Sequence, residues 1–150
     1  MRTDFEDLGM EVVLINPNDE NFLQTFEETI IQKGISAMLA NTIMRCDVII
    51  KAHDMKLPTV WVIHESWPQD KLDYYAKEVF LRKNLGAEMI KLAFRVCNCI
   101  VFPSNMQKGL YKGLYRERAA HTIYNGIPLR NLDEFKETRD RAEIRSSLGY

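Results

Sequence analysis

Short apolar runs alternate with longer stretches of helical periodicity along this 150-residue chain, and the alternation limits the folds open to it. The clearest run, residues 59–63 (TVWVI), is almost entirely apolar, whereas a strand with one solvated face would alternate apolar with polar residues. Four further runs occur at residues 11–15, 35–40, 99–102 and 121–124. Buried strands joined by helices predict a parallel sheet with helices on both faces.

The predicted fold class is therefore α/β, with a Rossmann-like doubly wound parallel sheet of about five strands. The helical stretches between the strands have recognisable ends: Asn41 and Ser104 are good N-cap residues, and Gly34 can end the helix that begins near Asp19. A long helical stretch over residues 70–96 contains Gly86, which predicts either two helices or one kinked helix.

Composition excludes several classes of protein. The net charge of −1 provides no field that would attract nucleic acid. No apolar run approaches the roughly 20 residues that span a membrane, and no signal peptide is visible. Cys46, Cys97 and Cys99 are odd in number and lack disulfide-like spacing, which indicates a cytoplasmic location. No further zinc ligands accompany Cys97 and Cys99, so no metal site is predicted.

The candidate site follows from the predicted topology, because ligands of such sheets bind beyond the carboxyl ends of the strands. His64, Glu65 and Ser66 come directly after the strongest strand. The imidazole of His64 either faces a ligand crevice or caps the following loop, and spacing alone leaves both readings open. Asp47 and Asp54 are interpreted as solvated helix surface. The chain has no GxGxxG, GxSxG, HExxH or Walker phosphate-loop motif, so neither dinucleotide nor ATP binding is supported.

Four motifs in order resemble the retaining GT-B glycosyltransferases of family four. They are WVIHES at residues 61–66, VFPS at 101–104, TIYNGIPL at 122–129 and RDRAEIRSSLG at 139–149. The ANT of residues 40–42 and the CDVI of residues 46–49 fit the same pattern. The resemblance covers almost the whole chain at plausible separations.

The resemblance implies half of a GT-B architecture. Residues 1–128 would form a partial N-terminal, acceptor-side domain, and residues 129–150 the linker and first helix of the donor domain. His64 would contact the reacting sugars in the interdomain cleft. Glu65, Ser104, Asn125 and Gly126 would bind substrate near it. The substrates would be a nucleotide-sugar donor and a sugar or lipid acceptor, with no separate cofactor, and a hexose would be transferred with retention.

Two departures from the family pattern shape the functional expectation. The family's first strand and glycine-rich loop are absent from the sequence, and so are the donor-domain groups that grip the diphosphate. Such a chain should be inactive alone and should need a donor-side domain or a second copy. Two alternatives remain: a non-catalytic Rossmann-like binding module that needs a partner chain, and an unrelated receiver-like regulator. The second lacks support, because no acidic cluster follows the first predicted strand at Asn16.

Overall fold

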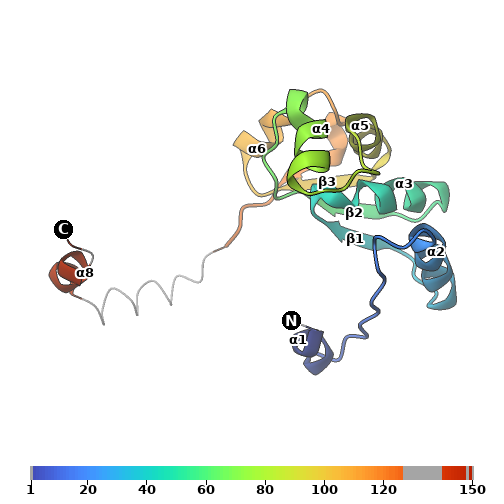
Figure 1. Cartoon of the computed structure of the whole chain (residues 1–150), viewed down its shortest axis with the longest axis horizontal. Coiled ribbons are helices and arrows are strands. Elements are labelled where there is room, and N and C mark those ends of the chain that lie inside the picture. Colours follow the sequence, from blue (N-terminus) through green and yellow to red (C-terminus); the bar gives the residue numbers. More distant parts are fainter. Residues whose placement is uncertain (1, 127–139, 148, 150) are drawn as a thin grey trace.

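The computed structural model describes residues 2–126, 140–147 and 149, and within them the chain forms a four-stranded sheet packed against helices (Figure 1). All neighbouring strands are parallel, and their spatial order follows the sequence. The strands are β1 (Met38–Asn41), β2 (Thr59–Val62), β3 (Cys99–Phe102) and β4 (Ala120–Thr122).

Helical segments precede every strand of the sheet. Before β1 lies α2 (Phe22–Gln32), and before β2 lie η1 (Ile43–Arg45) and α3 (Cys46–Asp54). Before β3 lie η2 (Gln69–Lys71), α4 (Leu72–Tyr74), η3 (Tyr75–Val79) and α5 (Ala87–Val96). Before β4 lie α6 (Asn105–Leu110) and η4 (Glu117–Ala119). The predicted break at Gly86 is confirmed, since α5 begins immediately after it. Two further helices are α1 (Arg2–Asp7) and α8 (Arg141–Ser147).

The core lies between the sheet and the helices. Side chains alternate across a strand, so β2 directs Trp61 towards the helices, in register with Ala40 of β1 and Ile100 of β3. Trp61 and Ile100 are completely buried. The Trp61 ring packs against Phe94 of α5, with ring centroids 5.1 Å apart. Burial of large side chains of this kind is the main stabilising term of such a domain.

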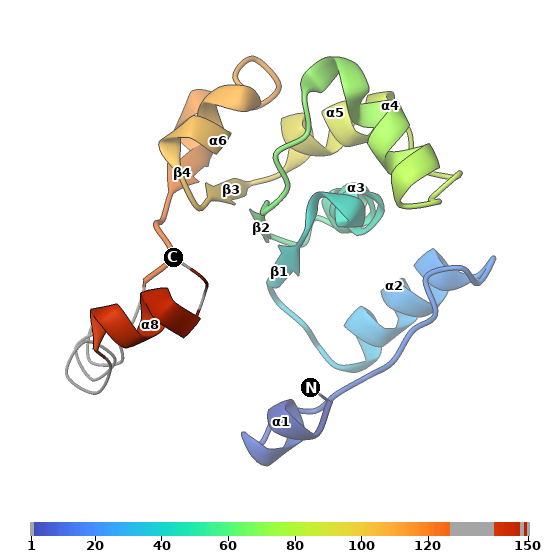
Figure 2. The same cartoon turned by 60° about the vertical axis from the view of Figure 1, so that its left-hand side comes forward.

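Among the described residues no helix packs on the opposite side of the sheet, and α2, α3 and α5 lie on one side of it in Figure 2. We call this opposite side the open face. Its apolar side chains alternate with the buried ones along each strand. They are Leu39, Val60, Val62, Cys99, Val101 and Ile123. Leu39 is 67% exposed and Ile123 62% exposed. The sheet therefore has one buried and one accessible side.

The prediction of helices on both faces was wrong. Consecutive strands are spatial neighbours here, so successive right-handed connections all advance in one direction and pass over the same face. Helices on the second face would require a reversal of strand order. Four of the five predicted strands form. Residues 11–15 do not form a strand, and Val13 and Leu14 in this segment are exposed.

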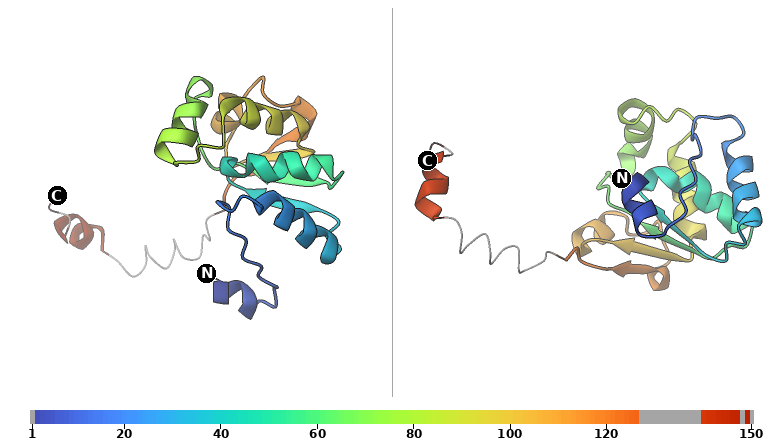
Figure 3. Two further views of the ribbon diagram at one scale, coloured as in Figure 1. Left: turned by 45° about the vertical axis from the view of Figure 1, so that its right-hand side comes forward. Right: turned by 90° about the horizontal axis from the view of Figure 1, so that it is seen from below.

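The segments at either end of the described part of the chain are exposed. Residues 3–11 are exposed throughout, and α1 lies apart from the helices that cover the sheet (Figure 3, left). In α8 every described side chain is exposed as well. The predicted helix over residues 139–148 is thus found at Arg141–Ser147. The predicted linker lies outside the described residues.

Candidate functional site

His64 lies two residues beyond the end of β2, at the carboxyl edge of the sheet, and its side chain is exposed. It falls on the open-face side of the alternation, because Trp61 and Ile63 point into the core. His64 and Asn125 line a concavity of about 300 Å³. The other residues that line it are Pro103 and the open-face residues Leu39, Val60, Val62, Val101 and Ile123. The imidazole is therefore accessible to a ligand at this edge.

The carboxylate of Glu65 ties the His64 loop to the end of β1. Oε2 accepts hydrogen bonds from the backbone amide of Ile43 at 2.9 Å and from that of His64 at 3.2 Å. Oε1 accepts a hydrogen bond from the hydroxyl of Thr42. Both carboxylate oxygens are thus engaged by the chain itself. Such charge-assisted bonds to backbone amides are among the stronger ones in proteins.

Thr42 is held in a conformation that is rare for a residue with a side chain. Its φ is 78° and its ψ is 142°, a region that favours glycine. Every polar group of Thr42 is engaged. Its amide donates to the carbonyl of Val62 at 2.9 Å, its carbonyl accepts from Nε1 of Trp61 at 2.8 Å, and its hydroxyl bonds to Glu65. These bonds offset a backbone strain of roughly 1–3 kcal/mol.

Hydrogen bonds from α6 and from the residue that follows it hold the same loop. The carbonyl of Glu65 accepts hydrogen bonds from Nε2 of Gln107 at 2.6 Å and from the hydroxyl of Tyr111 at 2.9 Å. The hydroxyl of Tyr111 in turn accepts the amide hydrogen of Trp67 at 2.9 Å. Burial, together with the nearby charge of Glu65, raises the pKa of Tyr111 to about 12. The backbone that carries His64 is therefore fixed on two sides.

The other predicted site residues are spread along the carboxyl edge. Ser104 is the N-cap of α6, and its Oγ accepts the amide hydrogen of Gln107 at 3.1 Å. Asn125 and Gly126 are exposed just after β4, and Asn125 shares the concavity with His64. Ser104 does not line that concavity. The structure thus brings His64 and Asn125 together, and gives Glu65 and Ser104 contacts within the chain.

Sequence reasoning missed three residues that shape this site: Thr42 as a strained residue, Gln107 and Tyr111. A signal existed for Gln107, because Ser104 followed three positions later by a glutamine is a capping-box pattern. Its side chain nevertheless reaches Glu65 instead of the start of its own helix. Tyr111 offers no local signal, since an aromatic residue at helical spacing is typical of a core position.

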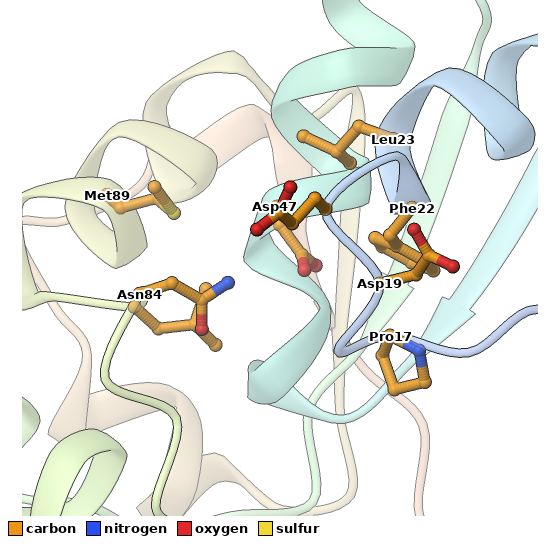
Figure 4. A pocket seen from close by; sticks show the side chains of 9 residues that line it. Pro17, Asp19, Phe22, Leu23, Asp47, Asn84 and Met89 are labelled. Atoms are coloured by element: carbon orange, nitrogen blue, oxygen red, sulfur yellow. The ribbon is translucent and has the colours of Figure 1, made fainter.

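A second pocket lies where α2, α3 and α5 begin, and its volume is about 230 Å³ (Figure 4). The side chains of Asp19, Glu20 and Asp47 line it. Helix N-termini favour anions, but Asp19 and Glu20 place negative charge there, whereas the charge of Asp47 is paired with Arg82 and Arg45. A diphosphate would therefore meet repulsion in this pocket.

The interpretation of Asp47 as solvated helix surface was wrong. Asp47 is 7% exposed, not solvated, whereas Asp54 is exposed as expected. Its carboxylate lies 3.3 Å from Arg82 and 3.6 Å from Arg45. Burial lowers the pKa of Arg45, and the charge of Asp47 opposes that shift. Removing one partner of a buried pair like this leaves an uncompensated charge, so Asp47 is a structural residue.

No group of three or more histidine, cysteine or carboxylate side chains in the described part of the chain is placed to hold a metal ion. None of the helices in that part has the length and hydrophobicity needed to cross a membrane. Comparison with protein-family models, curated proteins and solved structures finds no match for this chain.

Proposed function

We propose that this chain forms the acceptor-side wall of a retaining, GT-B-type glycosyltransferase site, in which His64 contacts the sugar. The proposal rests first on the ordered motifs from WVIHES to RDRAEIRSSLG. The observation that carries it further is the exposed imidazole of His64 on a loop fixed by Glu65, Gln107 and Tyr111. A rigid support holds a sugar-contacting group without an ordering cost at the moment of reaction.

In this proposal the residues divide into contacting and positioning groups. His64 can donate or accept a hydrogen bond at a sugar hydroxyl, and Asn125 can do the same from across the concavity. Glu65 is a positioning residue, since both of its carboxylate oxygens are engaged within the chain. The donor diphosphate needs positive charge or free helix N-termini from a donor-side domain, because the pocket at the N-termini of α2, α3 and α5 is acidic.

The three histidines of the chain allow a direct binding test. His53 lines a pocket at the opposite edge of the sheet, beside Pro58, and His121 lies on β4. We expect the imidazole NMR signals of His64 alone to shift during titration with nucleotide sugars, free hexoses and alkyl glycosides. His64→Ala should abolish the binding, and His53→Ala should leave it unchanged.

The titration should be run on dilute protein, so that any association between copies does not contribute. Saturable shifts at His53 or His121 with none at His64 would contradict the proposal. An absence of any response at millimolar sugar would contradict it equally. Either result would favour the second candidate, a non-catalytic binding module. The uncovered apolar face of the sheet supports that candidate, because single-domain proteins rarely expose a contiguous apolar surface without a partner.

A further inference from the structure

β1 is the end strand of the sheet, and its outer edge is open. The amides of Met38 and Thr42 donate to carbonyls on the β2 side, each at 2.9 Å. Backbone groups alternate in direction along a parallel strand, so the amides of Leu39 and Asn41 point away from β2. No strand of the described chain pairs with this side of β1. A row of unpaired amides and carbonyls is a template for the addition of another strand.

A groove of about 440 Å³ lies along this edge. Ala37 and Leu39 line it together with Ile30 of α2, and with Glu11 and Val13 of the segment that precedes α2. Of these residues, Leu39 alone also lines the concavity of the candidate site. The groove is therefore a separate place on the molecule.

Residues 11–15 present a second unpaired backbone beside the same groove. They have the composition of a strand, but within the described chain none of their amides or carbonyls makes a hydrogen bond. The carboxylate of Glu11 pairs with Lys33 of α2 at 2.5 Å, and Ile15 packs against the core, so both ends of the segment are held. Figure 2 shows the segment beside α2. Two unpaired backbones thus border one groove.

An extended polypeptide is the ligand that matches such a groove. The outward groups of β1 recur at every second residue, which is the spacing of a neighbouring strand. The sequence of β1, MLAN, contains neither a charge nor a proline, the residues that commonly protect an edge strand. The charged residues that line the groove, Glu11 and Lys33, are paired with each other. An apolar segment is therefore favoured over a charged one.

We propose that this groove accepts an extended, apolar segment of a partner protein, which adds to the sheet as a strand between β1 and residues 11–15. Its backbone bonds to Leu39 and Asn41 on one side and to the unpaired groups of residues 11–15 on the other. β1 has four residues, so the docked segment is about 13 Å long. This inference is independent of the proposed glycosyltransferase function.

The test uses a capped peptide of five valines flanked by lysines, and follows amide hydrogen exchange of the whole chain by NMR. At a free peptide concentration of ten times its Kd, exchange at Leu39 and Asn41 should slow by about tenfold. The amides of Met38 and Thr42 already bond within the sheet, so their exchange should change much less. This pattern distinguishes pairing at the outer edge of β1 from a general gain in stability.

Two controls separate backbone pairing from apolar contact. The same peptide with every valine N-methylated keeps its side chains but lacks those backbone donors, and it should give no protection. Leu39→Pro removes an amide that faces outward, a change that an edge strand tolerates, and should weaken peptide binding by roughly tenfold. Thr122→Pro makes the same change at the outer edge of β4 and should bind as the parent does. Circular dichroism checks that both variants fold, and the peptide pair decides the question if one does not.

Three results would contradict the proposal. Slow exchange at Leu39 and Asn41 in the chain without peptide would mean that the edge is already paired, by residues 11–15 or by a second copy. Equal protection by the N-methylated peptide would show apolar contact without strand addition. A lack of protection by the valine peptide at millimolar concentration would show that this edge does not take up a strand.

Discussion

The carboxylate of Glu65 accepts hydrogen bonds from the end of β1 and from its own loop. Removing it in Glu65→Ala leaves the Ile43 amide and the Thr42 hydroxyl without their partner. We expect the free energy of unfolding to fall by about 2 kcal/mol, measured by urea denaturation. Glu78→Ala is the control, because Glu78 is exposed and should change stability by less than about 0.5 kcal/mol. Equal effects of the two substitutions would refute this role for Glu65.

Thr42 combines a strained backbone with a hydroxyl that is in use, and two substitutions separate these contributions. Thr42→Val removes the hydroxyl and keeps the positive φ on a β-branched residue. Thr42→Gly also removes the hydroxyl but relieves the strain. We expect the glycine variant to be more stable than the valine variant by about 1 kcal/mol in thermal or urea unfolding. A glycine variant that is the less stable of the two would show that strain at this position is negligible.

At the scale of single residues, the sequence predicts which side chains follow strands but not what they contact. His64 and Asn125 were placed at the carboxyl edge because parallel strands end on one side. The engagement of Glu65 with Thr42 depends on a backbone conformation that threonine rarely adopts, so no propensity argument anticipates it. Asp47 was misjudged for a related reason, since its partner Arg82 lies 35 residues further along the chain.

The elements that surround the site give a prediction about alkaline pH. The folded chain holds the pKa of Tyr111 at about 12, whereas a tyrosine in an unfolded chain has a pKa of about 10. The unfolded chain therefore loses this proton first as the pH rises. The stability that Tyr111 contributes is complete below pH 10 and declines between pH 10 and 12.

The measurement is the free energy of unfolding from pH 9 to pH 12, for the parent and for Tyr111→Phe. The parent should lose stability more steeply over that interval. Parallel curves for the two proteins would mean that the hydroxyl of Tyr111 is not held in its protonated form by the fold.

Helix α1 makes no visible contribution to the packed layers, since residues 3–11 are exposed throughout. We expect a variant that begins at Glu11 to retain the thermal midpoint of the parent to within a few degrees, as judged by circular dichroism. A large drop in the midpoint would show that this helix packs against the sheet in solution.

Strands and helices were well predicted where buried runs sit between clear caps, as at residues 59–63 and at Ser104. Residues 11–15 have the composition of a strand, yet no neighbouring strand pairs with them in the described chain. Strand formation needs a partner as well as propensity, and one sequence segment does not reveal whether the partner exists. The order of the strands was likewise not contained in the alternation of runs.

For the molecule as a whole, the glycosyltransferase proposal predicts no useful turnover by the chain alone. Positioning of two reactants supplies roughly 7–11 kcal/mol of a barrier, and each ~1.4 kcal/mol is tenfold in rate. In this proposal the described residues supply His64 on the acceptor side and leave the diphosphate to a donor-side domain. The assay uses a panel of nucleotide sugars and glycoside acceptors, with and without a donor-side domain added in trans.

Transfer should appear only when the donor-side domain is present, should be lost in His64→Ala and should persist in His53→Ala. Turnover by the isolated parent would show that this chain binds the donor by itself. Turnover with the added domain that His64→Ala retains would remove His64 from the reaction.

The consecutive order of the strands also bears on how the chain is made. Each strand pairs with the one that precedes it in sequence, so its template has already been synthesised when it leaves the ribosome. Translation at about 5–20 residues per second gives each β-α-β connection time to close before the next strand emerges. No established strand pair has to open to admit a later strand. The sheet can therefore grow at a single edge during translation, from β1 towards β4.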